Sequence, residues 1–268
     1  MASDSMPLGR QTEYPDRYAP ELLYPIDRSE NRKSLALTGP WYGVDVWNAY
    51  EISWLDARGL PQVAMGRIHV PAGSRYLVES KSLKLYLNSL NQSVYDSVGE
   101  LQALLEKDLS AAAGTPVRVE LSAVDEDETL YAHPPKALVL ETELADFRPE
   151  PGRPLAAAGP RVSERLCSHL LKSQCPVTGQ PDWGTLLIDY RGAALDREAL
   201  LTYLIGFRQQ QDFHEHCVEK IFTDLMIRCE PEALTVGAFY TRRGGLDINP
   251  WRSTDPDRLP ELYRLRRQ

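Results

Sequence analysis

The chain has 268 residues, of which 43% are hydrophobic and 25% are charged. This balance is typical of a globular protein and excludes a chain that is disordered throughout. Thirty lysine and arginine residues stand against 38 acidic residues, and the formal net charge of −8 argues against binding to nucleic acid through one broad basic face. A local basic pocket for a phosphate group remains compatible with this charge.

The sequence predicts no membrane-spanning helix, because no apolar stretch reaches the ~18–20 residues that such a helix needs. Residues 1–14 are polar and lack the apolar core of a signal peptide. We therefore expect a cytoplasmic protein without a membrane partner. The cysteines form no C-x-x-C pair, which argues against a disulfide framework and against a structural zinc site. They are Cys167, Cys175, Cys217 and Cys229.

The first part of the chain is predicted to hold two strands joined by a turn, a short third strand, two helices and a closing strand. Leu83, Leu87 and Leu90 recur at helical spacing, whereas Val117 and Val119 alternate as in a strand. These elements cover residues 44–55, 62–70, 76–79, 82–91, 98–109 and 116–124.

Residues 141–160 are rich in proline, glycine and alanine and are interpreted as a linker or exposed loop. Beyond them the order of elements is similar, with a short helix or helix-like segment, a strand, two helices and a final strand. These cover residues 162–170, 185–190, 196–207, 213–228 and 234–240. The similarity predicts an internal repeat with halves at residues 1–148 and 149–268. The fold class is α+β, with antiparallel sheets backed by paired helices.

The first stretch that suits chemistry is a loop rich in proline and glycine at residues 172–184. A thiolate at Cys175 is a strong nucleophile, and Asp182 can serve it as a proton donor if the chain returns to its vicinity. The alternative is that Cys175 is a small apolar filler and that Asp182 caps a turn. The other three cysteines lie on apolar faces or ends of helical segments, where core filling is expected.

The second stretch, residues 79–89, lies where a strand meets a helix. Free N–H groups at the helix start and nearby lysines suit a phosphate. The alternative is simple capping, with Ser80 as the N-cap and the lysines in solvent.

The third stretch, residues 213–216, begins the penultimate helix. His214 and His216 are spaced i, i+2 and point apart on a helix, and no H-E-x-x-H motif is present, so zinc is not expected. Glu215 is suited to bind the N–H edge of a heterocycle.

The fourth stretch, residues 240–252, sets two arginines beside two glycines. Guanidinium groups next to exposed backbone N–H groups suit phosphate recognition, and the alternative is a basic turn after a strand. Neither a Rossmann nor a P-loop glycine motif occurs, so a dinucleotide would be held in another way.

Together these stretches resemble the NADPH-dependent nitrile reductases that reduce 7-cyano-7-deazaguanine to 7-aminomethyl-7-deazaguanine in queuosine biosynthesis, and specifically their long, two-domain type. The resemblance runs from about residue 41 to residue 252, with a variable patch at residues 125–160. The matching segments are residues 50–55, 59–64, 79–86, 173–175, 180–184, 213–215, 217–219 and 240–253.

This resemblance implies a tunnelling fold, in which tandem ferredoxin-like halves surround a central tunnel. It implies that Cys175 attacks the nitrile carbon to form a thioimide, that Asp182 donates the proton, and that NADPH supplies two hydrides. No metal is implied, and we expect a homo-oligomer, most simply a dimer. The implied substrate-binding residues are Val78, Glu79, Ser80, His214 and Glu215. The implied NADPH-binding residues are Ser80, Lys81, Arg243 and Gly244.

Two other classes of function were weighed against this one. A tunnelling-fold pterin hydrolase of the GTP cyclohydrolase type holds zinc with cysteines and a histidine, and this sequence has no closely spaced cysteine pair near a histidine. The presence or absence of bound zinc discriminates between the two. A non-catalytic purine-binding protein is the other alternative, and Cys175 with Asp182 argues against it.

Overall fold

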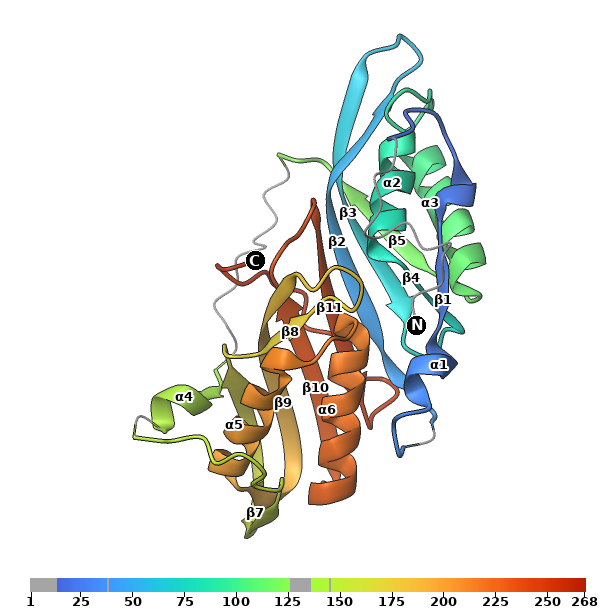
Figure 1. The fold of residues 1–268 in the computed structure, drawn as a ribbon. Helices are drawn as coiled ribbons and strands as arrows, with labels where there is room; N and C mark the ends of the chain where they lie inside the picture. Colours follow the sequence, from blue (N-terminus) through green and yellow to red (C-terminus); the bar gives the residue numbers. More distant parts are fainter. Residues whose placement is uncertain (1–13, 38, 126–135, 145) are drawn as a thin grey trace. The chain divides into compact units, whose positions relative to one another are not determined.

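The structure, a computed structural model, describes residues 14–37, 39–125, 136–144 and 146–268 (Figure 1). The chain forms two compact units that are interleaved in sequence. Unit 1 takes its described residues from 1–30, 46–128 and 242–248, and unit 2 takes its described residues from 31–45, 129–241 and 249–268. The predicted division into halves at residues 1–148 and 149–268 describes an internal repeat in the sequence, not these compact units, and it stays a prediction.

Unit 1 places two helices on one face of an antiparallel sheet (Figure 1). In strand order the sheet runs β5-β3-β2-β11, and the first and last residues of these strands are Arg118–Ser122, Pro61–Pro71, Tyr42–Leu55 and Leu246–Ser253. The helices are α2 (Ser80–Ser89) and α3 (Val98–Ala113). A small second sheet pairs β1 (Pro25–Asp27) with β4 (Tyr76–Val78), and a 3-10 turn η1 (Pro20–Leu22) precedes it. A short helix, α1 (Arg28–Arg32), follows β1.

Helix α2 forms where its sequence predicts, because Leu83, Leu87 and Leu90 fall on one face and are all buried. The expected N-cap is off by one residue. Glu79, not Ser80, caps the helix, and its carboxylate accepts hydrogen bonds from the backbone N–H of Lys81 and Ser82, each at 2.8 Å.

Unit 2 also sets helices against a sheet that is mostly antiparallel. Its strand order is β11-β10-β9-β7-β6, with β8 paired to β9. Besides β11, these strands are β10 (Ala233–Tyr240), β9 (Pro181–Leu195), β7 (Ala157–Ser168), β6 (Leu138–Val139) and β8 (Lys172–Gln174). The helices are α4 (Leu140–Glu143), α5 (Arg197–Gly206), the 3-10 turn η2 (Phe207–Gln209) and α6 (His214–Cys229). Strands β9 and β10 and helices α5 and α6 enclose one apolar core.

One predicted element is wrong. Residues 162–170 were expected to be helical, but residues 157–168 form strand β7, in which Leu166 lies opposite Ile188 of β9. Val162, Leu166 and Leu170 are spaced by four, and an even spacing fits a strand face as well as a helix face. The end of the predicted linker, residues 157–160, belongs to the same strand.

The other predicted strands and helices are confirmed, as is the α+β class. The structure adds strand β11 at Leu246–Ser253, within the stretch for which the sequence predicts either phosphate recognition or a basic turn. None of the helices in the described residues combines the length and the apolarity needed to cross a membrane.

Candidate active site

In unit 1, the predicted substrate-binding segment lies at the junction of β4 and α2. Val78 and Glu79 are buried, and Ser80 and Lys81 are half-buried. Burial raises the pKa of Glu79, although hydrogen bonds from Lys81, Ser82 and Ser80 act in the opposite direction. Two backbone N–H groups at the start of α2, those of Lys81 and Ser82, already bind the Glu79 carboxylate, so the side chains of Ser80 and Lys81 are the candidate contacts for a phosphate.

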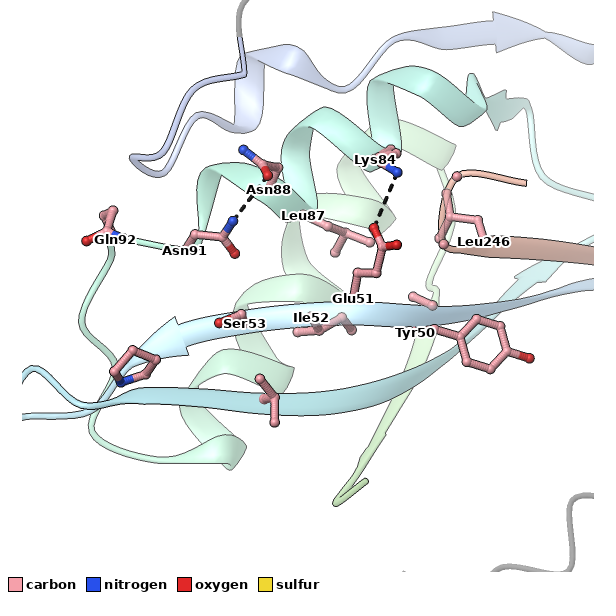
Figure 2. Close-up of a pocket in the computed structure, with 15 residues that line it drawn as sticks. Tyr50, Glu51, Ile52, Ser53, Lys84, Leu87, Asn88, Asn91, Gln92 and Leu246 are labelled. Atoms are coloured by element: carbon pink, nitrogen blue, oxygen red, sulfur yellow. Dashed lines mark hydrogen bonds and ion pairs between the residues drawn. The ribbon is translucent and has the colours of Figure 1, made fainter. Parts of the chain in front are cut away.

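Gly244 and Gly245 form the two-residue turn of a hairpin, and Arg243 and Leu246 flank the turn as a bridged pair. The N–H of Arg243 donates to the carbonyl of Leu246 at 2.9 Å, and Gly244 and Gly245 have φ of +61° and +78°. Such angles favour glycine, which explains the pair of glycines. The turn lies beside Lys84 of α2 and Glu51 of β2 (Figure 2).

In unit 2, strands β8 and β9 bring Cys175 and Asp182 to the same end of a hairpin. Ser173 pairs with Asp182 across the two strands. The loop between them is closed by hydrogen bonds of 2.9 Å from the N–H of Cys175 to the carbonyl of Gln180 and from the N–H of Gly179 to the carbonyl of Cys175. Cys175 is 3% exposed and Asp182 is 6% exposed. Cys175 and Asp182 are seven residues apart in sequence because one tight loop joins strands β8 and β9.

A histidine joins this hairpin from α6. The Nε2 of His214 lies 3.3 Å from Oδ2 of Asp182. The imidazole also stacks on the ring of Tyr240, with centroids 3.9 Å apart and an interplanar angle of 15°. A carboxylate in contact with an imidazole can exchange a proton with it, so this pair is equipped for acid–base chemistry.

Three of the four thiols are held protonated near neutral pH. Burial raises the pKa of Cys167 to about 12, that of Cys217 to about 12 and that of Cys229 to about 11. A thiol that is not ionised is a poor nucleophile. These three residues are buried in unit 2, as expected for core cysteines. Cys175 is the candidate nucleophile because it lies on the hairpin that also carries Asp182.

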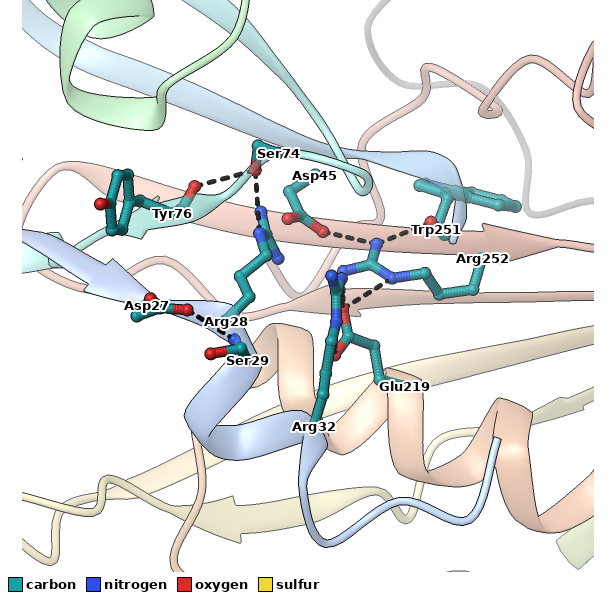
Figure 3. Close-up of polar contacts among 10 residues, drawn as sticks. All are labelled: Asp27, Arg28, Ser29, Arg32, Asp45, Ser74, Tyr76, Glu219, Trp251 and Arg252. Atoms are coloured by element: carbon teal, nitrogen blue, oxygen red, sulfur yellow. Dashed lines mark hydrogen bonds and ion pairs between the residues drawn. The ribbon is translucent and has the colours of Figure 1, made fainter. Parts of the chain in front are cut away.

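Glu215 follows His214 in the first turn of α6 and is 3% exposed. One helical turn further on, Glu219 lies at the centre of a buried ionic cluster (Figure 3). It accepts hydrogen bonds from Nη2 of Arg252 at 2.8 Å and from Nη2 of Arg32 at 2.6 Å. Arg252 also donates to Asp45 at 2.7 Å. Residues four apart share a helix face, so this cluster fixes the rotation of α6 that places Glu215.

Arg252 is fully buried. Burial would lower the pKa of its guanidinium, but the carboxylates of Asp45 and Glu219 outweigh this, and the pKa is raised. The sequence reading missed this cluster. Its directly bonded members are up to 207 residues apart, and only the paired signs of charge could have pointed to it.

Among the described residues, no group of three or more histidine, cysteine, aspartate and glutamate side chains is arranged to hold a metal ion. The site residues fall in both units. Val78, Glu79, Ser80, Lys81, Arg243 and Gly244 belong to unit 1, and Cys175, Asp182, His214 and Glu215 belong to unit 2.

A buried cysteine on a strand hairpin, next to a carboxylate–histidine pair and on an α+β scaffold, defines a candidate covalent thiol catalyst. Comparison with known families makes this specific. Residues 14–121 match the family described as "Nitrile reductase, 7-cyano-7-deazaguanine-reductase N-term", and residues 181–258 match the family described as "QueF-like protein".

Full-length relatives give the same result. The protein named NADPH-dependent 7-cyano-7-deazaguanine reductase from Dechloromonas aromatica is 50% identical to this chain, and the match covers 99% of this chain and 96% of the relative. The protein of the same name from Bordetella bronchiseptica is also 50% identical, and the match covers all of both chains. The one from Chromohalobacter salexigens is 52% identical over 98% of this chain and 96% of its own. The chain therefore belongs to the 7-cyano-7-deazaguanine reductase family, and the resemblance seen in the sequence is confirmed.

Among solved structures, an archaeosine synthase QueF-Like in the apo form aligns with 35% of this chain and 90% of its own, with 17% identity and a TM-score of 0.30. A score at this level does not define a shared fold.

We expect the buried cluster around Glu219 to be essential for stability. Replacing Arg252 with Met removes one cation and leaves Asp45 and Glu219 buried, and loss of one partner of such a pair costs about 3–5 kcal/mol. Urea unfolding measures the change. Arg161→Met serves as the control, because its partner Glu232 lies on the surface and the free energy of unfolding should hardly change. Equal losses in the two variants would contradict the assignment.

Proposed function

We propose that this protein reduces the nitrile of 7-cyano-7-deazaguanine to the primary amine 7-aminomethyl-7-deazaguanine, with NADPH as the reductant, in queuosine biosynthesis. The observation that carries the proposal is the identity of 50–52% to reductases of that name along 98–100% of the chain. The hairpin that carries Cys175 and Asp182 supports it independently.

The proposed chemistry begins with the thiol of Cys175. Its sulfur forms a bond to the nitrile carbon, one π bond of the C≡N group breaks, and the thiol proton ends on the nitrogen. The product is a thioimide, whose C=N group is a better hydride acceptor than the nitrile. Asp182 is placed to take the thiol proton and to deliver it to the nitrogen, with His214 as its neighbour.

Recognition of the deazaguanine ring is assigned to carboxylates. Glu215 offers two acceptor oxygens to a ring N–H and an exocyclic amine, and in a buried site an unpaired donor of the substrate is costly. His214, Val78, Glu79 and Ser80 are the other proposed contacts. The raised pKa of Glu79 means that its acceptor form is lost on acidification at a higher pH than for an ordinary glutamate.

When bound, NADPH would supply two hydrides, one from each of two molecules. After the first hydride adds to the thioimide carbon, the carbon–sulfur bond breaks, which restores the Cys175 thiol and leaves an imine for the second hydride. Two further protons balance the overall reduction to the amine. The chain offers groups that fit a phosphorylated dinucleotide. Gly244 lies exposed in a turn with positive φ, and the half-buried Arg243, Lys81 and Ser80 add donors. These four residues are the proposed NADPH contacts.

The tunnelling fold with tandem ferredoxin-like halves, divided at residues 148 and 149, is also part of the proposal. It is supported by the pairs of helices, α2 with α3 and α5 with α6, that back largely antiparallel strands within each unit. A homodimer without direct contact to nucleic acid is proposed with it. The need for NADPH and for a free thiol at Cys175 fits the cytoplasm.

The test of this function follows NADPH absorbance after 7-cyano-7-deazaguanine is added to the purified protein. We expect absorbance to fall with the wild type and to stay constant with Cys175→Ala, because the variant cannot form the thioimide. Without NADPH, mass spectrometry should find the substrate attached to Cys175 of the wild type. An adduct on Cys167, Cys217 or Cys229 instead would refute the assignment.

Asp182→Asn keeps the shape of the side chain and removes the transferable proton. We expect the rate to fall by about 10²–10⁴, the range for loss of general acid–base catalysis. Single-turnover kinetics with excess enzyme would measure the step directly. Turnover close to that of the wild type would show that the proton comes from another group.

Glu215→Gln replaces an acceptor with a group that also donates. Substrate binding should weaken by about 1.5–3 kcal/mol, the range for hydrogen bonds to charged groups. Calorimetric titration with substrate and, separately, with NADPH distinguishes the roles. If both ligands bind equally less well, Glu215 supports the fold and does not contact the base.

A further inference from the structure

The tyrosine that ends strand β10 contacts the carboxylate–histidine pair of the candidate active site. The ring of Tyr240 stacks on the imidazole of His214, with the ring centroids 3.9 Å apart and an interplanar angle of 15°. The same imidazole places its Nε2 atom 3.3 Å from Oδ2 of Asp182. All three residues belong to unit 2. The chemistry proposed above gives Tyr240 no role, although its ring contacts one of the two residues of the pair.

The strand pairing makes room for this ring. Tyr240 lies opposite Gly184 on strand β9. Gly184 comes two residues after Asp182, so the two project to the same face of β9. A Cβ atom added to Gly184 would lie 3.3 Å from Cδ1 and 3.4 Å from Cε1 of Tyr240. The ring therefore covers the glycine on the face of β9 from which Asp182 projects.

The stack also orients the imidazole. A histidine ring is commonly fixed by a hydrogen bond to its second nitrogen. The Nδ1 atom of His214 is buried and has no hydrogen-bond partner among the described residues. A contact with Asp182 at one ring atom leaves the imidazole able to tilt about that contact. A flat neighbour that lies nearly parallel to the imidazole opposes such a tilt, so Tyr240 supplies the constraint that the second nitrogen does not.

Tyr240 is unsuited to carry the proton itself. Its side chain is fully buried. Burial raises the pKa of its phenol well above the ordinary value, so the hydroxyl stays protonated near neutral pH. The ring of Tyr240, and not its hydroxyl, makes the directional contact with His214.

We propose that Tyr240 is a positioning residue for the acid–base step, and that its ring holds the imidazole of His214 in contact with Asp182. In this step the thiol proton leaves the sulfur of Cys175 for the Asp182 carboxylate and passes from there to the nitrile nitrogen. His214, held by Tyr240, keeps the carboxylate in one orientation throughout. The proposal rests on the proposed function for the identity of the reaction, whereas the stack is a feature of unit 2 alone.

A purely structural role is the alternative for any buried aromatic residue. Tyr240 belongs to the apolar core that β9, β10, α5 and α6 enclose, and a large ring there stabilises the fold whatever it contacts. Loss of packing alone lowers the free energy of unfolding and does not depend on His214. A positioning role acts on the reaction rate and acts through His214.

The experiment measures how fast saturating 7-cyano-7-deazaguanine becomes attached to Cys175 without NADPH, by quenched-flow mass spectrometry of the full-length protein. Tyr240→Leu should lower this rate ~10–100-fold, because a misplacement of about 1 Å can cost ~10²-fold. Tyr240→Phe keeps the flat ring and should stay within ~3-fold of the wild type. In a His214→Ala background, Tyr240→Leu should change the rate less than ~3-fold, because residues that act as a unit have non-additive effects.

Phe239→Leu is the matched control. Phe239 precedes Tyr240 on β10 and is also buried, but its ring contacts Trp251 and Tyr263. This variant removes a core ring without touching His214, so the attachment rate should stay close to that of the wild type. Equal fold losses from Tyr240→Leu with and without His214 would overturn the proposal, and so would a Tyr240→Phe variant as slow as Tyr240→Leu.

Gly184→Ala is the second variant, and it carries the test if Tyr240→Leu does not fold. Its added methyl group would press on the Tyr240 ring without removing it. The attachment rate should fall ~2–10-fold, and the fall should disappear in the His214→Ala background. A fall of the same size in both backgrounds would contradict the positioning role.

The NMR signal of the His214 ring tests the stack without any reaction. Protons above the face of an aromatic ring are shielded, so this signal should lie upfield in the wild type and in Tyr240→Phe. It should move downfield in Tyr240→Leu or shift in Gly184→Ala, and His214→Asn identifies it by its absence. A signal that does not move would overturn the proposal. A wild type that shows the shielded signal but forms no adduct would instead refute the proposed function.

Discussion

The carboxylate of Glu219 is buried and shared by two guanidinium groups, and the placement of the start of α6 depends on it. A buried carboxylate is tolerated only if cations and hydrogen bonds replace the water it has lost. Arg252 meets that requirement from strand β11 and Arg32 from helix α1. The cluster thus anchors α6 at Glu219, one turn after Glu215, and the first residue of the same helix, His214, lies 3.3 Å from Asp182.

All four cysteines are buried, and position in the fold distinguishes Cys175 from the other three. Core burial suppresses ionisation of Cys167, Cys217 and Cys229, so these residues act as small apolar side chains. Cys175 differs in its position, since it directly follows strand β8, and the paired strand β9 carries the carboxylate of Asp182. The candidate nucleophile and its proposed proton donor therefore lie on one hairpin that backbone hydrogen bonds close.

Most helices and strands of the fold could be predicted from the sequence, and the predictions that were wrong have physical causes. Leu83, Leu87 and Leu90 identify α2 because local spacing alone decides a helical face. The segment around Leu166 was read as helical because a spacing of four does not distinguish the two periodicities, and its long partner β9 decided the outcome. The buried cluster around Arg252 could not be predicted, because pairing between residues distant in sequence leaves no local pattern. The short motifs at Cys175, His214 and the glycine turn were recognisable for the opposite reason, since each is compact in sequence.

At the start of α2, the structure changes the prediction of a phosphate-binding helix N-terminus, because Glu79 caps this helix. A helix N-terminus is a favourable place for a phosphate only while its N–H groups are available. Here the Glu79 carboxylate already accepts hydrogen bonds from two of these N–H groups. A second anion at the same point would lie next to the buried carboxyl group of Glu79, whose pKa burial raises. Lys84 lies about one turn further along the helix, beside Gly244 of the hairpin turn and paired with Glu51. The backbone N–H groups of Lys81 and Ser82 are therefore committed to Glu79, and any anion that binds at this end of α2 would depend on side chains instead.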